Sequence, residues 1–173
     1  RSAYLAVVVL ASSSRAIAAE PSESQLVITS RNGGADLDVR WDIALPDLSF
    51  VVDPKEDAQK QRAAINAYAF THLFLSGDGV PCDLDPKEQT VTGSRIILTG
   101  VGRCEGGTPV LDVDYRLFFD IKEIENHRGI MRLNDQESHV FTTKDRRGRF
   151  ELDAKPLKFP TVPTALAAAS LLA

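Results

Sequence analysis

Three histidines are the residues of this sequence best suited to bind a metal ion or to exchange protons. His127 lies in a charged stretch from Glu123 to Arg128, and His139 lies in an expected strand. The two could meet across a hairpin built from the flanking strands, as the convergent imidazoles of a metal site must. His72 falls on the stripe of an expected helix. Structural or surface roles are expected for all three, and metal binding by His127 and His139 is the alternative.

Two carboxylates on one strand are the remaining candidates for acid–base chemistry. Asp112 and Asp114 alternate with apolar residues and share a strand face with Arg116. Paired carboxylates can act as general acid and base, but on an amphipathic strand they commonly form the solvated face. The sequence contains no G-x-S-x-G nucleophile elbow and no phosphate-binding loop. We therefore expect neither an enzyme nor a bound cofactor.

The segment from Asp53 to Asp57 begins like a calcium-binding loop, but Ala58 stands where such a loop requires glycine. Asp53 followed by Pro54 is more typical of an N-cap and the first position of a helix. The absence of glycine and further proline predicts a helix from there to about His72. Ile65, Tyr68, Ala69 and His72 fall on one stripe, and the helix is expected to pack on one face or edge of a sheet.

The two cysteines, Cys82 and Cys104, are the candidate site residues of the chain. In an exported domain an even pair usually forms one disulfide. The loop between them would contribute about 3 kcal/mol on the chain-entropy model. Two free thiols are the alternative. A zinc site is not expected, because no pair of histidines lies nearby to complete it.

Strands with one polar face position these residues. Leu37 to Leu45 alternates between apolar and polar residues with Trp41 at its centre, and Asn32-Gly33-Gly34 joins it to Gln25–Ser30 as a hairpin. Leu111, Val113, Tyr115 and Leu117 form a second alternating set, and together with Trp41 they are the expected core.

Further strands are expected at shorter runs, separated by glycine-containing turns such as Arg146-Arg147-Gly148. Arg95–Thr99 is apolar on both faces and should lie centrally, with Gly100 and Gly102 ending it. The other runs are Leu73–Ser76, Gln89–Thr92, Gly129–Leu133, Ser138–Thr143 and Arg149–Asp153. Many short strands with one inserted α-helix predict a mainly β fold, an antiparallel β-sandwich of immunoglobulin-like architecture.

The chain's ends predict export. Arg1, the apolar run from Tyr4 to Leu10, and Ala16-Ile17-Ala18 have the form of a signal peptide or N-terminal anchor over residues 1–18. Residues 20–156 form the expected extracytoplasmic domain. Residues 157–173 are a linker and an apolar tail that could begin a membrane helix. The 173 residues carry a net charge of −4 without a basic patch, so nucleic acid is not an expected partner.

Three segments together resemble the exported N-terminal domain of HupE/UreJ-like bacterial membrane proteins, named after hydrogenase and urease accessory proteins linked to nickel supply. The segments are WDIALPDLSF at 41–50, AYAFTHLFLSGDGVPCDL at 67–84 and VDYRLFFDIKEIENHRGIMRL at 113–133. The resemblance implies a β-rich domain ahead of a membrane domain and supports pairing Cys82 with Cys104. It carries no metal ligand to this chain, because those of the family are attributed to membrane helices.

The predicted function is a non-catalytic, periplasmic or extracytoplasmic accessory domain of a membrane protein resembling HupE/UreJ nickel permeases. It would dock a partner or form the entrance of the transport path. The expected partner is a membrane protein or membrane domain, with membrane association through a terminal apolar segment. The alternatives are an accessory subunit of a larger membrane complex, anchored by a terminal helix, and a periplasmic metal-binding protein.

Overall fold

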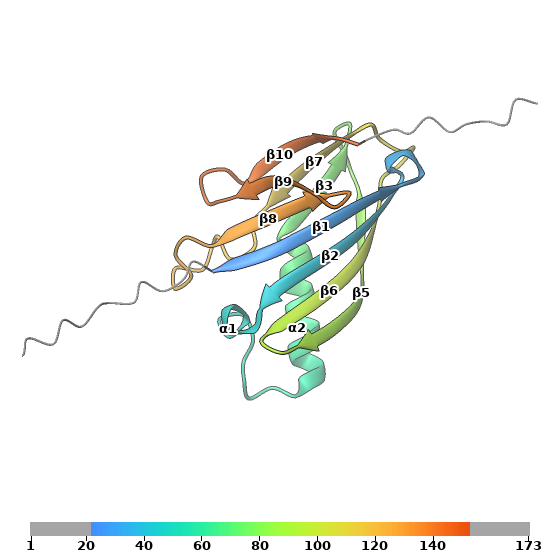
Figure 1. Ribbon diagram of the computed structural model, residues 1–173. Helices are drawn as coiled ribbons and strands as arrows, with labels where there is room; N and C mark the ends of the chain where they lie inside the picture. The colour runs from blue at the N-terminus through green and yellow to red at the C-terminus, as the bar shows by residue number, and fades with distance from the viewer. Residues whose placement is uncertain (1–21, 153–173) are drawn as a thin grey trace, which may run out of the picture.

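The computed structural model describes residues 22–152, apart from the side chains of residues 137 and 138. The predicted signal segment 1–18 and the apolar tail 157–173 lie outside the described residues (Figure 1). In chain order, the elements are β1 (Glu23–Arg31), the 3-10 helix η1 (Asn32–Gly34), β2 (Asp36–Ala44), α1 (Leu45–Leu48), α2 (Ala58–Thr71), β3 (Leu73–Gly77), β4 (Val80–Pro81), β5 (Asp83–Thr92), β6 (Arg95–Arg103), β7 (Val110–Tyr115), β8 (Arg128–Leu133), β9 (Gln136–Phe141) and β10 (Arg147–Glu151).

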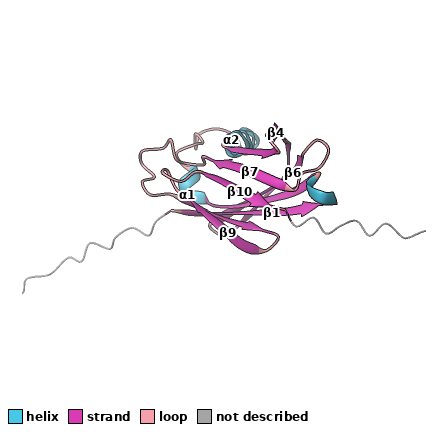
Figure 2. Cartoon of the chain, turned by 90° about the horizontal axis from the view of Figure 1, so that it is seen from above, coloured by secondary structure: helices cyan, strands magenta, loops and turns pink. Residues whose placement is uncertain are grey.

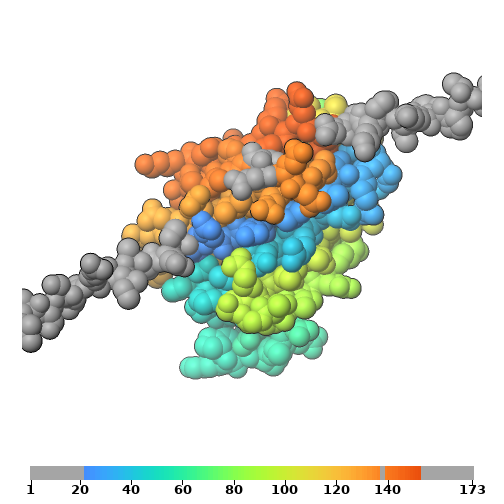
Figure 3. Space-filling view, in the orientation of Figure 1, coloured from blue at the N-terminus to red at the C-terminus, as the bar shows by residue number. Residues whose placement is uncertain are grey.

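Two sheets stack on one another, as the view from above shows (Figure 2). The larger has the strand order β5-β6-β2-β1-β8-β9, and the smaller has the order β10-β7-β3-β4. Figure 3 shows the outer face of the larger sheet, from β9 in orange to β5 in green. Helix α2 lies behind β2 and β6, beside the smaller sheet (Figure 1). The predicted mainly β sandwich with an inserted helix is confirmed.

One pairing departs from the antiparallel pattern. β1 and β2 form the predicted hairpin, but β1 pairs on its other side with β8 in parallel, with Leu26 opposite Met131. A parallel neighbour requires a long connection, and the chain from β1 to β8 passes through the second layer. Because the chain crosses to the other sheet and returns, β8 can run in the same direction as β1, which a hairpin connection does not permit.

The space between the layers is filled by the predicted core. Trp41, Leu111, Val113, Tyr115 and Leu117 are each at most 1% exposed. The ring of Tyr115 stacks on Phe141 at a centroid distance of 5.2 Å and lies 5.4 Å from that of Trp41. Leu117 lies just after β7, so its burial comes from the turn that follows the strand. The alternating pattern thus identified the core correctly.

The predicted start of the helix is wrong. The helix begins at Ala58, and Asp57 is its N-cap, accepting hydrogen bonds from the backbone N–H groups of Gln59 and Lys60 at 3.0 Å each. Asp53 instead accepts from the N–H of Lys55 within the preceding turn. An aspartate satisfies free N–H groups equally well at either position, so the preference for Asp53 could not exclude a start at Asp57.

Several predicted strand boundaries are also wrong; β5 begins at Asp83 instead of Gln89, and β9 spans Gln136–Phe141 instead of Ser138–Thr143. β6 continues through Gly100 and Gly102, because the ring of Phe70 occupies the place of a side chain at Gly100; a Cβ there would lie 2.6 Å from that ring. A glycine inside a strand often marks such a close approach. The predicted turn at Arg146-Arg147-Gly148 is also wrong, because Arg147 and Gly148 already begin β10, which pairs with β7.

Candidate functional site

An open groove of about 1170 Å³ crosses the outer face of the smaller sheet. Its apolar end is formed by Phe70 at the end of α2 and by Leu84 in β5. Phe74 of β3 lies along it, and its polar end is formed by side chains of β7 and β10. The alternation that buries Leu73 and Leu75 turns Phe74 outward, since neighbouring residues of a strand face opposite sides.

Asp114 holds three arginine side chains at the polar end of the groove. Its carboxylate accepts from Nε and Nη2 of Arg116 at 3.0 and 2.6 Å, and from Nε of Arg147 at 3.1 Å. The Nε atom of Arg146 lies 3.9 Å away. Hydrogen bonds from Arg116, and then from Arg147, lower the pKa of Asp114. The carboxylate is therefore ionised across the physiological pH range and orients a cationic cluster.

A second ion pair extends this cluster. The Nε atom of Arg149 lies 3.2 Å from Oδ1 of Asp112, two residues before Asp114 on the same face of β7. The four arginines of these pairs face only two aspartates, which leaves an excess of positive charge. The side chains of Arg147 and Arg149 are 70% and 69% exposed, so their free N–H groups point to solvent.

Phe74 connects the apolar and the charged ends. Its side chain is an exposed aromatic, with the residue 48% accessible. The guanidinium carbon of Arg116 lies 4.5 Å from the centre of its ring. Such a cation–π contact holds the arginine in place over one face of the ring. The groove thus presents an aromatic surface and ordered cations side by side.

Sequence reasoning found part of this site. Asp112, Asp114 and Arg116 share one face, as predicted. It missed Arg147 and Arg149, because the segment was read as a turn followed by a strand. The signal was present: exposed arginines alternate there with Gly148 and Phe150, which is a period of two.

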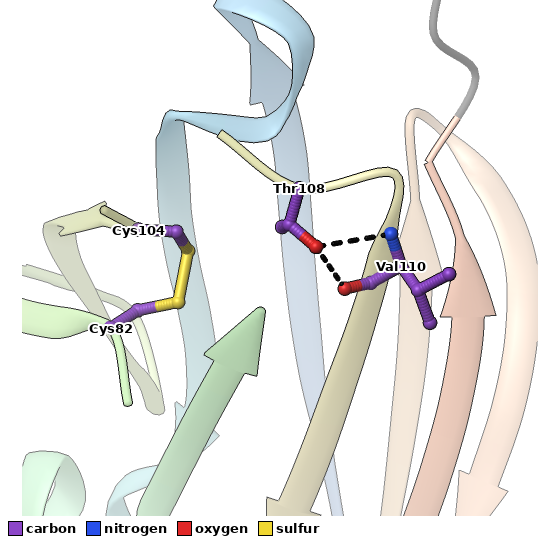
Figure 4. The surroundings of a disulfide bond; sticks show 4 residues. All are labelled: Cys82, Cys104, Thr108 and Val110. Atoms are coloured by element: carbon purple, nitrogen blue, oxygen red, sulfur yellow. Dashed lines mark hydrogen bonds between the residues drawn. A yellow bond between two sulfur atoms is a disulfide. The ribbon is translucent and has the colours of Figure 1, made fainter. Parts of the chain in front are cut away.

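The disulfide closes one side of the groove. Cys82 and Cys104 are bonded, so the junction of β4 and β5 is tied to the end of β6 (Figure 4). The N–H of Cys82, which lines the groove, donates to the carbonyl of Leu75 in β3 at 2.9 Å. The bond fits an oxidising, extracytoplasmic compartment. It also fixes the position of β4 beside β3.

Thr108 anchors the loop that follows Cys104. Its buried hydroxyl donates to the carbonyl of Val110 at 2.5 Å and accepts from the N–H of Val110 at 3.1 Å (Figure 4). The side chain lies against Gly77, where a Cβ would come within 2.6 Å of it. These contacts fix the position of the loop, and therefore the point at which β7 enters the smaller sheet.

A buried polar chain surrounds His127, which is only 1% exposed. Ser22 donates its hydroxyl proton to Asp47 at 2.6 Å and lies 2.6 Å from Nδ1 of His127. Because that proton is already used, Nδ1 must carry the hydrogen and donate to Ser22. Nε2 then accepts from one of the hydroxyls of Ser24 and Tyr115, which lie 3.0 and 3.2 Å from it and are hydrogen-bonded to each other.

Burial decides what this chain of hydroxyls can do. It lowers the pKa of His127 to about 4, so the imidazole is neutral at physiological pH. Ser24 is 0% exposed, so a substrate cannot approach the pair. The network is suited to holding the start of β1 against α1 and against the loop before β8. The expectation of a surface or structural histidine is thus resolved in favour of a structural one.

The other sequence candidates lie apart. His139 contacts the rings of Phe141 and Phe150, and its Nε2 lies 3.3 Å from Oδ2 of Asp145. His127 contacts a different set of rings, those of Tyr115, Phe118 and Phe119. His72 caps the end of α2, where its Nδ1 lies 2.7 Å from the carbonyl of Tyr68. No group of three or more metal-ligating side chains is found among residues 22–152.

Comparison with known proteins gives no family for the chain. No protein-family model and no curated protein matches it. Among the described residues, no helix has the length and apolar character needed to cross a membrane. The relationship to HupE/UreJ-like proteins therefore stays a prediction from the sequence segments quoted above.

Proposed function

We propose that this chain is a non-catalytic docking domain that works outside the cytoplasm as part of, or attached to, a membrane protein resembling HupE/UreJ permeases. The observation that carries the proposal is the groove on the smaller sheet. It combines an exposed Phe74 with arginines that Asp112 and Asp114 hold in place. Exposed aromatic and arginine side chains are the types most enriched at the centres of protein interfaces.

The disulfide between Cys82 and Cys104 supports the proposed compartment, because such bonds persist where the environment is oxidising. The signal-like residues 1–18 and the apolar tail 157–173 support attachment to a membrane. Either the permease arrangement or an accessory subunit of a larger membrane complex would place the groove beside a membrane partner.

Docking explains the groove better than catalysis does. A general acid must hold a proton near the working pH, whereas hydrogen bonds from Arg116 keep the pKa of Asp114 below its usual value. The metal-binding alternative has less support, because both ring nitrogens of His127 face the hydroxyls of Ser22, Ser24 and Tyr115.

Photo-cross-linking in cells tests the proposal. The complete protein would carry a photoreactive phenylalanine analogue at Phe74, or at Phe50 as the matched control; Phe50 is 52% exposed and does not line the groove. We expect a discrete adduct in the membrane fraction from position 74 only, and its loss when Arg147→Glu and Arg149→Glu are added. Equal adducts from both positions, or none from position 74, would contradict docking at this groove.

A further inference from the structure

We infer that the occupant of the groove is an extended peptide segment of a partner protein, one that carries acidic side chains next to aromatic ones. This inference rests on the proposed docking function and specifies the chemistry of the partner. Three features of the groove lead to it: its size, the arrangement of its charges, and the exposed ring of Phe74 beside the charges.

The size of the groove favours a peptide over a small molecule. Its volume of about 1170 Å³ exceeds the range of roughly 300–1,000 Å³ common for small-molecule pockets. It is open, and it extends from the end of α2 across β3 to β7 and β10. Such a shape suits a segment that lies across several strands.

The segment lies over side chains and does not add a strand to β3. The backbone of β3 beyond β4 is not accessible, because Leu73 and Leu75 are only 2% and 3% exposed. The carbonyl of Leu75 is also taken by the N–H of Cys82. Recognition therefore comes from Phe74 and the charged side chains of the outer face.

The charges select acidic side chains. Arg147 and Arg149 reach their aspartates through Nε at 3.1 and 3.2 Å. Nη2 of Arg149 makes a second, longer contact with Asp112, at 3.4 Å. Among the described residues, most of the terminal N–H groups of both arginines therefore remain available to a ligand. Arginine forks bind carboxylates through two parallel hydrogen bonds. The aspartates hold the guanidinium groups in place beforehand, which reduces the entropy lost when a ligand binds.

The rings select an aromatic side chain between the acidic ones. Arg116 lies over one face of Phe74, and the apolar side chains of Phe70 and Leu84 line the same groove as this half-exposed ring. An aromatic side chain of the ligand could pack there edge to face with the rings. Its acidic neighbours would then lie toward Arg147 and Arg149.

Fluorescence anisotropy with defined peptides tests this inference. The probes are labelled octapeptides in which glutamate alternates with phenylalanine, glutamate with glycine, or lysine with phenylalanine. We expect the glutamate–phenylalanine peptide to bind at least about tenfold more tightly than either other probe. Its affinity should also fall with added salt, because the arginines are exposed.

Variants locate the binding site. Arg147→Glu with Arg149→Glu should weaken binding of the glutamate–phenylalanine peptide at least about tenfold. Arg40→Glu, on an exposed position of the larger sheet, should leave it unchanged. If the double variant fails to fold by circular dichroism, Arg147→Gln with Arg149→Gln replaces it, since glutamine removes the charge without reversing it. An equal loss in Arg40→Glu would overturn the assignment to this groove.

Vesicles of phosphatidylglycerol distinguish the other source of negative charge. If vesicles bind through Arg147 and Arg149 while the peptides do not, the ligand is a lipid surface and the peptide inference is wrong. If neither probe binds but Phe74 still forms its adduct in cells, the docking proposal survives and the acidic–aromatic chemistry is rejected. Loss of that adduct would reject the docking proposal itself.

Discussion

Nδ1 of His127 lies 2.6 Å from the hydroxyl oxygen of Ser22, across 105 residues of sequence. Ser22 already donates to Asp47, so the imidazole donates to Ser22 and accepts at Nε2. One buried neutral ring thereby joins the first described residue of the domain to α1 and to the loop before β8. A protonated ring would also donate at Nε2, so the hydroxyls of Ser24 and Tyr115 would have to reorient and accept from it.

Acidification should therefore destabilise the fold through His127. Burial lowers its pKa from 6.5 to about 4. Because the folded state binds this proton more weakly than the unfolded state, the contribution is fully present above pH 6.5 and is lost as the pH falls toward 4. Between pH 6.5 and 5 the loss should be about 1.5 kcal/mol.

Urea unfolding at a series of pH values measures this loss. His127→Gln removes the titrating ring and should flatten the free energy of unfolding between pH 5 and about 6.5. His139→Gln is the matched control, because that histidine lies on β9 beside Asp145. An unchanged slope in His127→Gln would show that the imidazole is accessible to protons in the folded state.

Asp114→Asn should destabilise the domain by about 1–2 kcal/mol, because charged hydrogen bonds to Arg116 and Arg147 are lost and the arginines then repel one another. The pKa of Asp114 is lowered, so its contribution is present above 3.8 and is lost as the pH falls further. Thermal unfolding of the variant measures the effect. Arg147→Gln, at a largely exposed position, should cost much less; equal costs would show that Asp114 does not organise the cluster.

Replacing both cysteines with serine should lower the free energy of unfolding by about 3 kcal/mol, the value expected for closing a loop of this length. Their separation is 22 residues. The native protein should have a mass two hydrogens below that of the reduced chain and should not react with iodoacetamide. Two alkylatable thiols in the native, unreduced protein would contradict the bond between Cys82 and Cys104.

Two adjacent glycines should respond very differently to alanine. Both have positive φ, 66° at Gly33 and 85° at Gly34. A Cβ at Gly33 meets nothing within 4 Å, whereas one at Gly34 would lie 2.2 Å from the carbonyl oxygen of Thr108. Gly33→Ala should cost about 1–2 kcal/mol from backbone strain alone. Gly34→Ala should cost at least about 2 kcal/mol more, because the Thr108 loop must move.

Urea unfolding of the two alanine variants compares them directly. Gly34→Ala should also lower the thermal midpoint more than Gly33→Ala does, since both substitutions lie in one turn. Similar losses for Gly33→Ala and Gly34→Ala would show that the loop at Thr108 moves easily and does not fix the start of β7.

The sequence identified elements whose signals are local. Alternation from Leu37 to Leu45 predicted β2 with Trp41 in the core, because side chains of a strand point to opposite faces. It placed the start of α2 too early, at Asp53, since Asp53 and Asp57 both have the chemistry of an N-cap. It also predicted that β6 ends at Gly100. The ring that occupies the space beside Gly100 belongs to Phe70 of α2, which the local sequence of β6 does not show.

By itself, the sequence determined a mainly β domain, most of its strands, the core around Trp41 and Tyr115, and the cysteines available for one disulfide. Only the tertiary structure decided that His127, in a charged stretch of sequence, is buried, and that Arg147 and Arg149 join Asp112 and Asp114. These relationships depend on which strands become neighbours. Strand order is set by packing between distant segments, and a pattern read along the chain contains no direct record of it.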